Sequence, residues 1–174
     1  MGAASSFHTN LVQKSFATPD SSKSPDKCQL DTVDLGGGIS VTKTTFQPGW
    51  KWSECIKPSV GTETCGNYHV GVCISGKLAV SFPDGTEFEV GPGDGFVIPP
   101  GHDGWVVGDD PAVMYEIKAE PIAPGTVWVK KSFEAADSSK NFEKCALATL
   151  DLGAGISVTR ATYQPGWKWS ECIK

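Results

Sequence analysis

Two histidines and one cysteine carry the chemistry that this sequence offers most directly. His69 and His102 have imidazoles that bind borderline metal ions, and Cys65, four residues before His69, offers a softer thiolate. Such a set favours a transition metal, with Zn²⁺, Ni²⁺ or Cu preferred over Mg²⁺. The alternative interpretation is structural: His69 forms a hydrogen bond inside the fold, and His102 caps the turn at Pro99-Pro100-Gly101.

The residues around His102 predict the element that holds it. Residues 91–94 (GPGD) have turn chemistry, and residues 95–98 form a short apolar strand. Pro99 and Pro100 lack the N–H donors that a central ladder needs, so the chain must turn there. We therefore expect His102 at the mouth of this turn and a new strand starting at Trp105.

The spacing of Gly93, Pro99 and Gly101 resembles the second signature of the cupin superfamily. His69 precedes Gly76 by seven residues, as a ligand residue precedes a turn glycine in the first cupin signature. The resemblance covers about residues 28–119. It implies an all-β fold, a cupin-type jelly-roll β-barrel with a pocket in its mouth.

The metal-binding part of the signature departs from the cupin pattern. The family's His-x-His positions fall on Thr62 and Thr64 in one register, or on Cys55 and Lys57 in the other. His69 takes the position of the usual glutamate. On a cupin barrel His69 and His102 would face the mouth from adjacent strand ends, with Cys65 as a third ligand. The metal would be a divalent transition metal, namely Zn, Ni, Cu, Fe or Mn.

Residues 69–75 (HVGVCIS) predict a strand with two distinct faces. The resemblance places His69, Gly71 and Cys73 inside the barrel, where Gly71 leaves room for a ligand or relieves crowding. Val70, Val72 and Ile74 then point outward and need cover. That cover would be the N-terminal arm or a second subunit, and the latter predicts a homodimer.

Three tryptophans complete the predicted ligand site. Alternation over residues 50–55 puts Trp50 and Trp52 on one strand face, followed by a loop at residues 57–64. With Trp105 they would wall an apolar pocket anchored by His69 and His102, although core or dimer packing is the alternative role of the indoles. We favour a small-molecule-binding cupin. A metal-dependent enzyme of dioxygenase or isomerase type is the second hypothesis, and a structural or storage role is the third.

Composition narrows the remaining classes. The net charge is −5 and the basic residues are dispersed, so we expect no nucleic-acid partner. No apolar run reaches membrane-span length. Met1-Gly2-Ala3-Ala4-Ser5-Ser6 fits the N-myristoylation pattern, but it also fits an ordinary leader of small residues. The six cysteines show no CxxC pairing, which indicates reduced thiols and a cytoplasmic protein.

The sequence repeats itself. Residues 129–174 match residues 12–57 without a gap, at an offset of 117 and with about two-thirds identity. We therefore expect a disordered tail at 1–11, a barrel at 12–119, a linker at 120–128 and a partial second cupin module at 129–174. The second copy would belong to a tandem two-barrel protein, swap onto another chain, or replace residues 12–57 on its own barrel.

Overall fold

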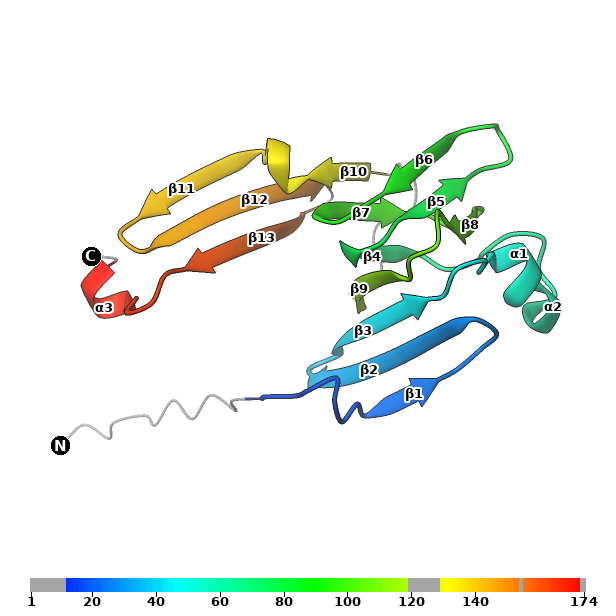
Figure 1. The fold of residues 1–174 in the computed structure, drawn as a ribbon, viewed down its shortest axis with the longest axis horizontal. Coiled ribbons are helices and arrows are strands. Elements are labelled where there is room, and N and C mark those ends of the chain that lie inside the picture. Colours follow the sequence, from blue (N-terminus) through cyan, green and yellow to red (C-terminus); the bar gives the residue numbers. More distant parts are fainter. Residues whose placement is uncertain (1–11, 119–128, 154, 173–174) are drawn as a thin grey trace.

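The computed structural model describes residues 12–118, 129–153 and 155–172, and these residues fold mainly into β-strands (Figure 1). The expected tail with Gly2 and the expected linker lie outside the described residues. The strands are β1 (Ser21–Lys23), β2 (Cys28–Gly36), β3 (Ile39–Phe46), β4 (His69–Ser75), β5 (Leu78–Ser81), β6 (Glu87–Val90), β7 (Asp94–Ile98), β8 (Asp103–Val106), β9 (Ala112–Lys118), β10 (Val129–Ser132), β11 (Ser138–Phe142), β12 (Cys145–Gly153) and β13 (Ile156–Tyr163). The short helices are α1 (Trp52–Cys55), α2 (Lys57–Val60), α3 (Trp169–Cys172) and one 3-10 turn (Phe133–Ala135).

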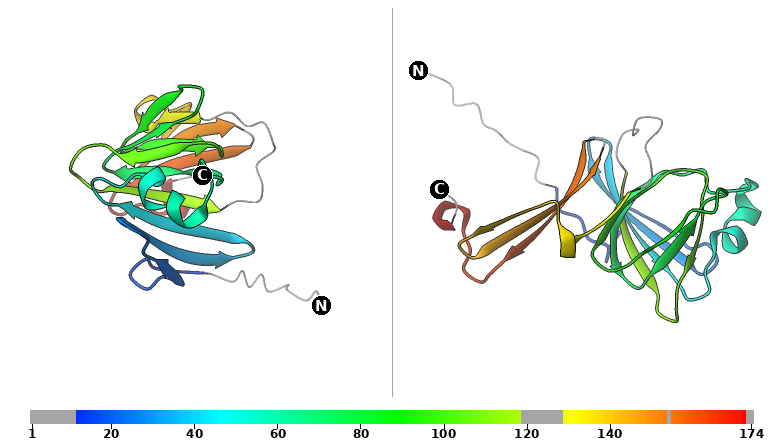
Figure 2. Two further views of the ribbon diagram at one scale, coloured as in Figure 1. Left: turned by 90° about the vertical axis from the view of Figure 1, so that its right-hand side faces the viewer. Right: turned by 90° about the horizontal axis from the view of Figure 1, so that it is seen from above.

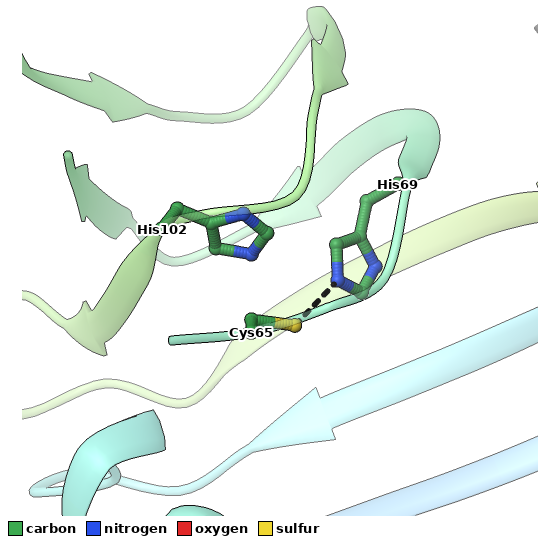
Figure 3. A group of neighbouring side chains, drawn as sticks. All are labelled: Cys65, His69 and His102. Atoms are coloured by element: carbon green, nitrogen blue, oxygen red, sulfur yellow. Dashed lines mark hydrogen bonds between the residues drawn. The ribbon is translucent and has the colours of Figure 1, made fainter. Parts of the chain in front are cut away.

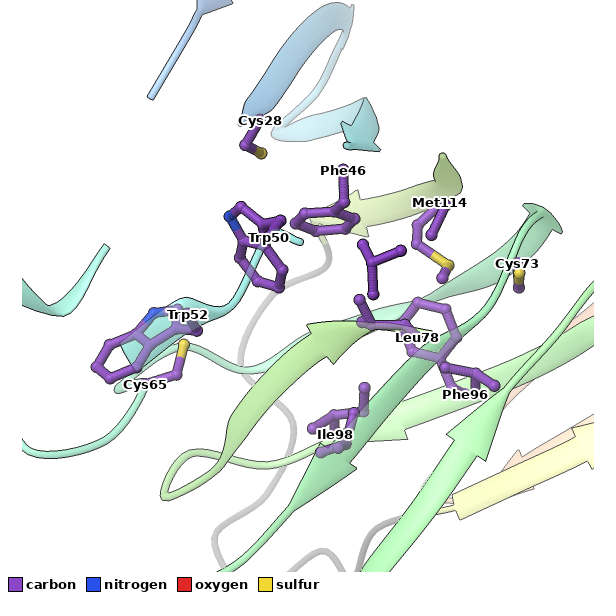
Figure 4. Packing of buried hydrophobic residues seen from close by; sticks show 14 residues of the cluster. Cys28, Phe46, Trp50, Trp52, Cys65, Cys73, Leu78, Phe96, Ile98 and Met114 are labelled. Atoms are coloured by element: carbon purple, nitrogen blue, oxygen red, sulfur yellow. The ribbon is translucent and has the colours of Figure 1, made fainter. Parts of the chain in front are cut away.

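Two antiparallel sheets form the barrel. The larger has the strand order β1-β2-β3-β9-β4-β7-β10, and the smaller has the order β6-β5-β8 (Figures 1 and 2). The space between them is filled by a core to which both sheets contribute, including Phe46, Trp50, Phe96 and Met114 (Figure 4). This is the all-β, jelly-roll architecture that the cupin resemblance implied.

Local structure around the first tryptophans differs from the expectation. Residues 50–55 do not form a strand, because the amides of Glu54 and Cys55 both donate to the carbonyl of Lys51 and start helix α1. The Ser53 amide donates to the Asp103 carboxylate at 3.0 Å, which ties the helix to β8. The expected loop at 57–64 begins with helix α2, which ends at Gly61 in the left-handed conformation (φ 72°).

The two faces of β4 separate as alternation predicts. Cys73 lies in the barrel core, whereas Val70 belongs to a second apolar cluster on the outside of the barrel. That outer cluster is completed by Phe133, Leu150 and Leu152, all from the second copy of the repeat. The cover of the Val70 face is therefore the chain's own second copy, which we had not expected.

The two copies of the repeat take different places. In the first copy β3 pairs with β9 and closes the barrel. In the second copy only β10 joins the barrel, by pairing with β7, while β11, β12 and β13 form a separate sheet (Figures 1 and 2). In this structure the first copy, and not the second, occupies the position beside β9.

Gly71 is a sharp test of barrel packing. A Cβ atom at Gly71 would overlap the carbonyl oxygen of Tyr115 and would lie 2.9 Å from Phe96 Cζ, so this glycine relieves crowding between strands. We expect Gly71→Ala to lower the free energy of unfolding by about 1–3 kcal/mol in urea titrations followed by tryptophan fluorescence. Gly66→Ala is the matched control, since a Cβ at Gly66 meets no atom within 4 Å. Equal stability of the two variants would contradict this account.

Candidate metal centre

Backbone pairing brings the two chain segments of the site together. Cys65 and His102 form an isolated antiparallel bridge, in which the Cys65 amide donates to the His102 carbonyl at 2.9 Å. The Gly101 amide donates back to the Cys65 carbonyl at 2.8 Å. The turn at Pro99-Pro100-Gly101 makes this possible, because Gly101 takes a φ of 101° that other residues rarely adopt. His69 enters from the neighbouring segment as the first residue of β4.

The side chains of Cys65, His69 and His102 converge on one point. One ligand atom from each residue lies within 4.8 Å of the others. Cys65 Sγ is 3.5 Å from His69 Nε2, and the two imidazoles meet edge to face with centroids 5.3 Å apart (Figure 3). These three residues, which we call the Cys-His-His group, form a group that could hold a metal ion.

The Nδ1 atom of each imidazole is engaged by a neighbouring group. His69 Nδ1 is 2.6 Å from a carboxylate oxygen of Glu116, which also accepts a hydrogen bond from the Thr44 hydroxyl at 3.2 Å. His102 Nδ1 donates to the Pro99 carbonyl at 2.6 Å. Because the Nδ1 atoms are engaged, both Nε2 atoms are available to the centre, as in known metal sites with outer-shell partners. The structural role and the ligand role of His102 are therefore compatible.

Glu116 is the residue that the sequence analysis missed. It lies on β9 directly opposite Gly71 of β4. Its neighbours on β9 alternate between the two faces of the strand: Tyr115 stacks on Phe16, whereas Met114, on the same face as Glu116, lies in the core. A single carboxylate on the inward face of a strand, next to His69 in the sheet, is the signal that could have identified it.

The electrostatics of the group favour a thiolate. Burial raises the pKa of the Cys65 thiol, but hydrogen bonds with His102 and His69 outweigh it and bring the pKa down to about 6. Burial lowers the pKa of His69, but the Glu116 carboxylate outweighs it and raises the pKa to about 10. Burial raises the pKa of Cys73 to about 11, so this other thiol of the barrel interior stays protonated. Cys65 thus carries the ligating form of cysteine near neutral pH.

Access to the group differs among its members. Cys65 and His102 are buried, whereas 26% of the His69 side chain is exposed. Of the three side chains, that of His69 is therefore the most accessible to solvent.

Two of the three predicted indoles line a hollow whose lining does not include the imidazoles. Trp50 and Trp105 line a surface hollow of about 330 Å³. The other residues of its lining are Gly49, Lys51, Glu54 and Val106. Helix α1 instead turns Trp52 into the core beside Cys65 (Figure 4). The lining of this hollow includes neither His69 nor His102, so the site separates into a metal-ligand group and an adjoining indole surface.

The chain is similar to one family model and to several solved structures. Residues 57–129 match the family model of the AraC-like ligand binding domain. Among solved structures, a Pseudomonas aeruginosa protein described as glyoxylate-induced is 13% identical, with a TM-score of 0.53, over 75% of this chain and 52% of that chain. The coconut allergen cocosin is 13% identical, with a TM-score of 0.42, over 57% of this chain and 30% of that one. A Bacillus subtilis oxalate decarboxylase variant is 16% identical, with a TM-score of 0.43, over 60% and 28%.

The comparisons define the class of fold. The barrel is of the cupin type, and residues 57–129 are similar to the AraC-like ligand-binding domain. The chain spans between 28% and 52% of the length of these three solved structures. No curated protein matches the sequence. Among the described residues, no helix is long and apolar enough to cross a membrane.

The pKa of Cys65 gives a direct test of the group. In the metal-free protein, we expect the ultraviolet absorbance of the thiolate to titrate with a midpoint of about 6, and this step to vanish in Cys65→Ser. Because the folded pKa is depressed from 9.0, the stability contributed by Cys65 is present above pH 9.0 and is lost as pH falls through about 6. Glu116→Gln should move the midpoint upward, since His69 then loses the charge that holds its proton. An unchanged midpoint in Glu116→Gln would contradict the coupling.

Proposed function

We propose that this protein binds a small molecule in the barrel mouth through a transition-metal ion held by Cys65 Sγ, His69 Nε2 and His102 Nε2. The observation that carries the proposal is the convergence of these three donor atoms within 4.8 Å, with the Nδ1 atoms of both imidazoles fixed from behind. The match to an AraC-like ligand binding domain supports a binding role for the same part of the chain.

The donor set indicates which metals fit. One thiolate and two imidazoles form the mixed sulfur–nitrogen set that suits Zn²⁺, and also Ni²⁺ and Cu. Glu116 is engaged with His69 Nδ1, so its carboxylate orients a ligand residue and does not complete the set. A set of oxygen ligands that would favour Mg²⁺ is not part of this group.

The fourth coordination position is where the small molecule would bind. Three protein donors would leave one position of a tetrahedral ion open, and the partial exposure of His69 supports access of a ligand to the group. The bound ion would supply a Lewis-acidic attachment point for an oxygen or nitrogen donor of the ligand. Trp52, packed beside Cys65, would report such binding through its fluorescence.

The open position also favours a second candidate, a metal-dependent enzyme of dioxygenase or isomerase type. Catalytic metal sites share the arrangement of three protein ligands and one exchangeable position. The two candidates differ in outcome. A binder leaves its small molecule unchanged and shows saturable fluorescence, whereas an enzyme converts the molecule at a rate that depends on the metal.

Metal analysis of the full chain tests the proposal. We expect about one equivalent of transition metal per chain after purification without added metal, and a loss of most of it in Cys65→Ser, His69→Ala and His102→Ala. Glu116→Gln should weaken metal affinity by roughly 10–100-fold, because His69 loses the partner that orients its ring. Glu54→Gln is the matched control, since Glu54 lies in the hollow beside Trp105 and outside the group. Metal content that is absent in the wild type, or unchanged in the Cys65 and His69 variants, would reject the proposal.

A further inference from the structure

The second copy of the repeat reproduces the fold of the first in detail. The same bulge interrupts the strand pair at Asp34/Gly36 and at Asp151/Gly153. The two aromatic pairs after the hairpins have almost the same geometry: Phe46–Trp50 has centroids 4.2 Å apart and Tyr163–Trp167 has centroids 4.4 Å apart. The pair β12–β13 therefore has the same structure as β2–β3, the strand pair that forms part of the barrel in the first copy.

The strand pairs β2–β3 and β12–β13 have different neighbours. In the first copy β3 pairs with both β2 and β9, whereas among the described residues β13 pairs with β12 alone. Phe46 and Trp52 are 8% and 7% exposed in the first copy. Their counterparts Tyr163 and Trp169 are 54% and 66% exposed. The face that closes a barrel in the first copy is thus left open in the second.

A hollow beside Phe133 provides an independent observation. It has a volume of about 410 Å³, and Arg160 and Thr162 of β13 contribute to its lining. Phe16, the counterpart of Phe133 in the first copy, stacks on Tyr115 of β9 with centroids 5.2 Å apart and an interplanar angle of 14°. Phe133 is 8% exposed, and the Arg160 guanidinium lies over its ring, 4.9 Å from the centroid. An aromatic residue at the position of Tyr115 in a neighbouring strand would take the place of this cation beside Phe133.

On the outer surface of the first copy, two apolar residues lack the packing that their counterparts in the second copy have. In the second copy, Val129 and Ile156 pack onto the outer face of the barrel. Their counterparts in the first copy, Val12 and Ile39, are 44% and 51% exposed. A second barrel closed by the second copy would offer an outer face of the same kind to these two residues.

We propose that the edge of β13, together with Tyr163 and Trp169, is a docking surface for a half-barrel. This half-barrel would have the strand pattern of residues 58–118, and it would follow the second copy as residues 58–118 follow the first copy. Lys174 corresponds to Lys57, the residue that precedes the segment 58–118 in the first module. Covalent connection raises the effective concentration of such a segment at the surface. Exposed strand edges and apolar patches of this kind mark interaction sites. The proposal does not depend on metal binding.

The test appends a second copy of residues 58–118 to the full chain after Lys174. We expect the amides of β13 to exchange with deuterium roughly 10-fold or more slowly in the extended chain than in the parent, since they gain a partner strand. Quenching of Trp169 by acrylamide should fall in parallel. Tyr163→Lys in the extended chain should restore fast exchange, whereas Lys140→Glu on β11 should leave the protection intact. Fast exchange of β13 in an extended chain whose first barrel remains protected would overturn the proposal.

A second experiment covers the case in which the appended segment does not fold. A chimera that carries the sequence of residues 129–174 in place of residues 12–57 asks whether the second copy fits a half-barrel already present in the protein. We expect β9 amides as protected as in the wild type, and an unprotected β9 would count against the proposal. Binding of residues 58–118 only as a separate polypeptide would overturn the proposed order. Concentration-dependent protection of β13 in the parent chain would assign the surface to a second copy of this chain instead.

Discussion

The close approach of β4 and β9 is the constraint on which the site depends. Gly71 permits it, since any side chain there would collide with the Tyr115 carbonyl and the Phe96 ring. The resulting register places Gly71 opposite Glu116, and the carboxylate of Glu116 then reaches His69 two residues earlier on β4. A backbone requirement at one glycine thereby fixes the orientation of an imidazole at the barrel mouth. The two side chains are 26% and 21% exposed, so this ion pair is screened less than a pair on the open surface.

The same contact links fold stability to site chemistry. Glu116 holds a proton on His69, and the two histidines in turn favour the thiolate of Cys65. In the metal-free protein the charges at the mouth are therefore carboxylate, imidazolium and thiolate. A metal ion that binds the thiolate and both Nε2 atoms would release the proton from His69, so metal affinity and pH are coupled. The same ionic contacts that are present in the metal-free protein therefore also keep Cys65 in the thiolate form that would bind a metal ion.

Parts of this arrangement could be predicted from the sequence because they depend on local chemistry. The residues around Pro99-Pro100-Gly101 specify a turn through missing donors and a positive φ, and His102 follows that turn directly. Alternation along residues 69–75 predicted the inner and outer faces of β4 correctly. Glu116 could not be placed in this way, since its role depends on strand pairing between segments 47 residues apart. The helix at Trp52 was missed for a related reason: a hydrogen bond from Ser53 to the distant Asp103 supports it.

The repeat shows how one sequence pattern supports two kinds of packing. The inner face of the first copy closes the barrel core, and the outer face of the second copy covers β4 and β7. Two differences between the copies follow this division. Leu150, the counterpart of Val33, is the larger residue and belongs to the outer cluster. Ala161, the counterpart of Thr44, lacks the hydroxyl that Thr44 donates to Glu116. That hydroxyl helps to lower the pKa of Glu116. A barrel closed by the second copy would lack this donor, so its carboxylate would hold the facing imidazole less firmly in the charged form.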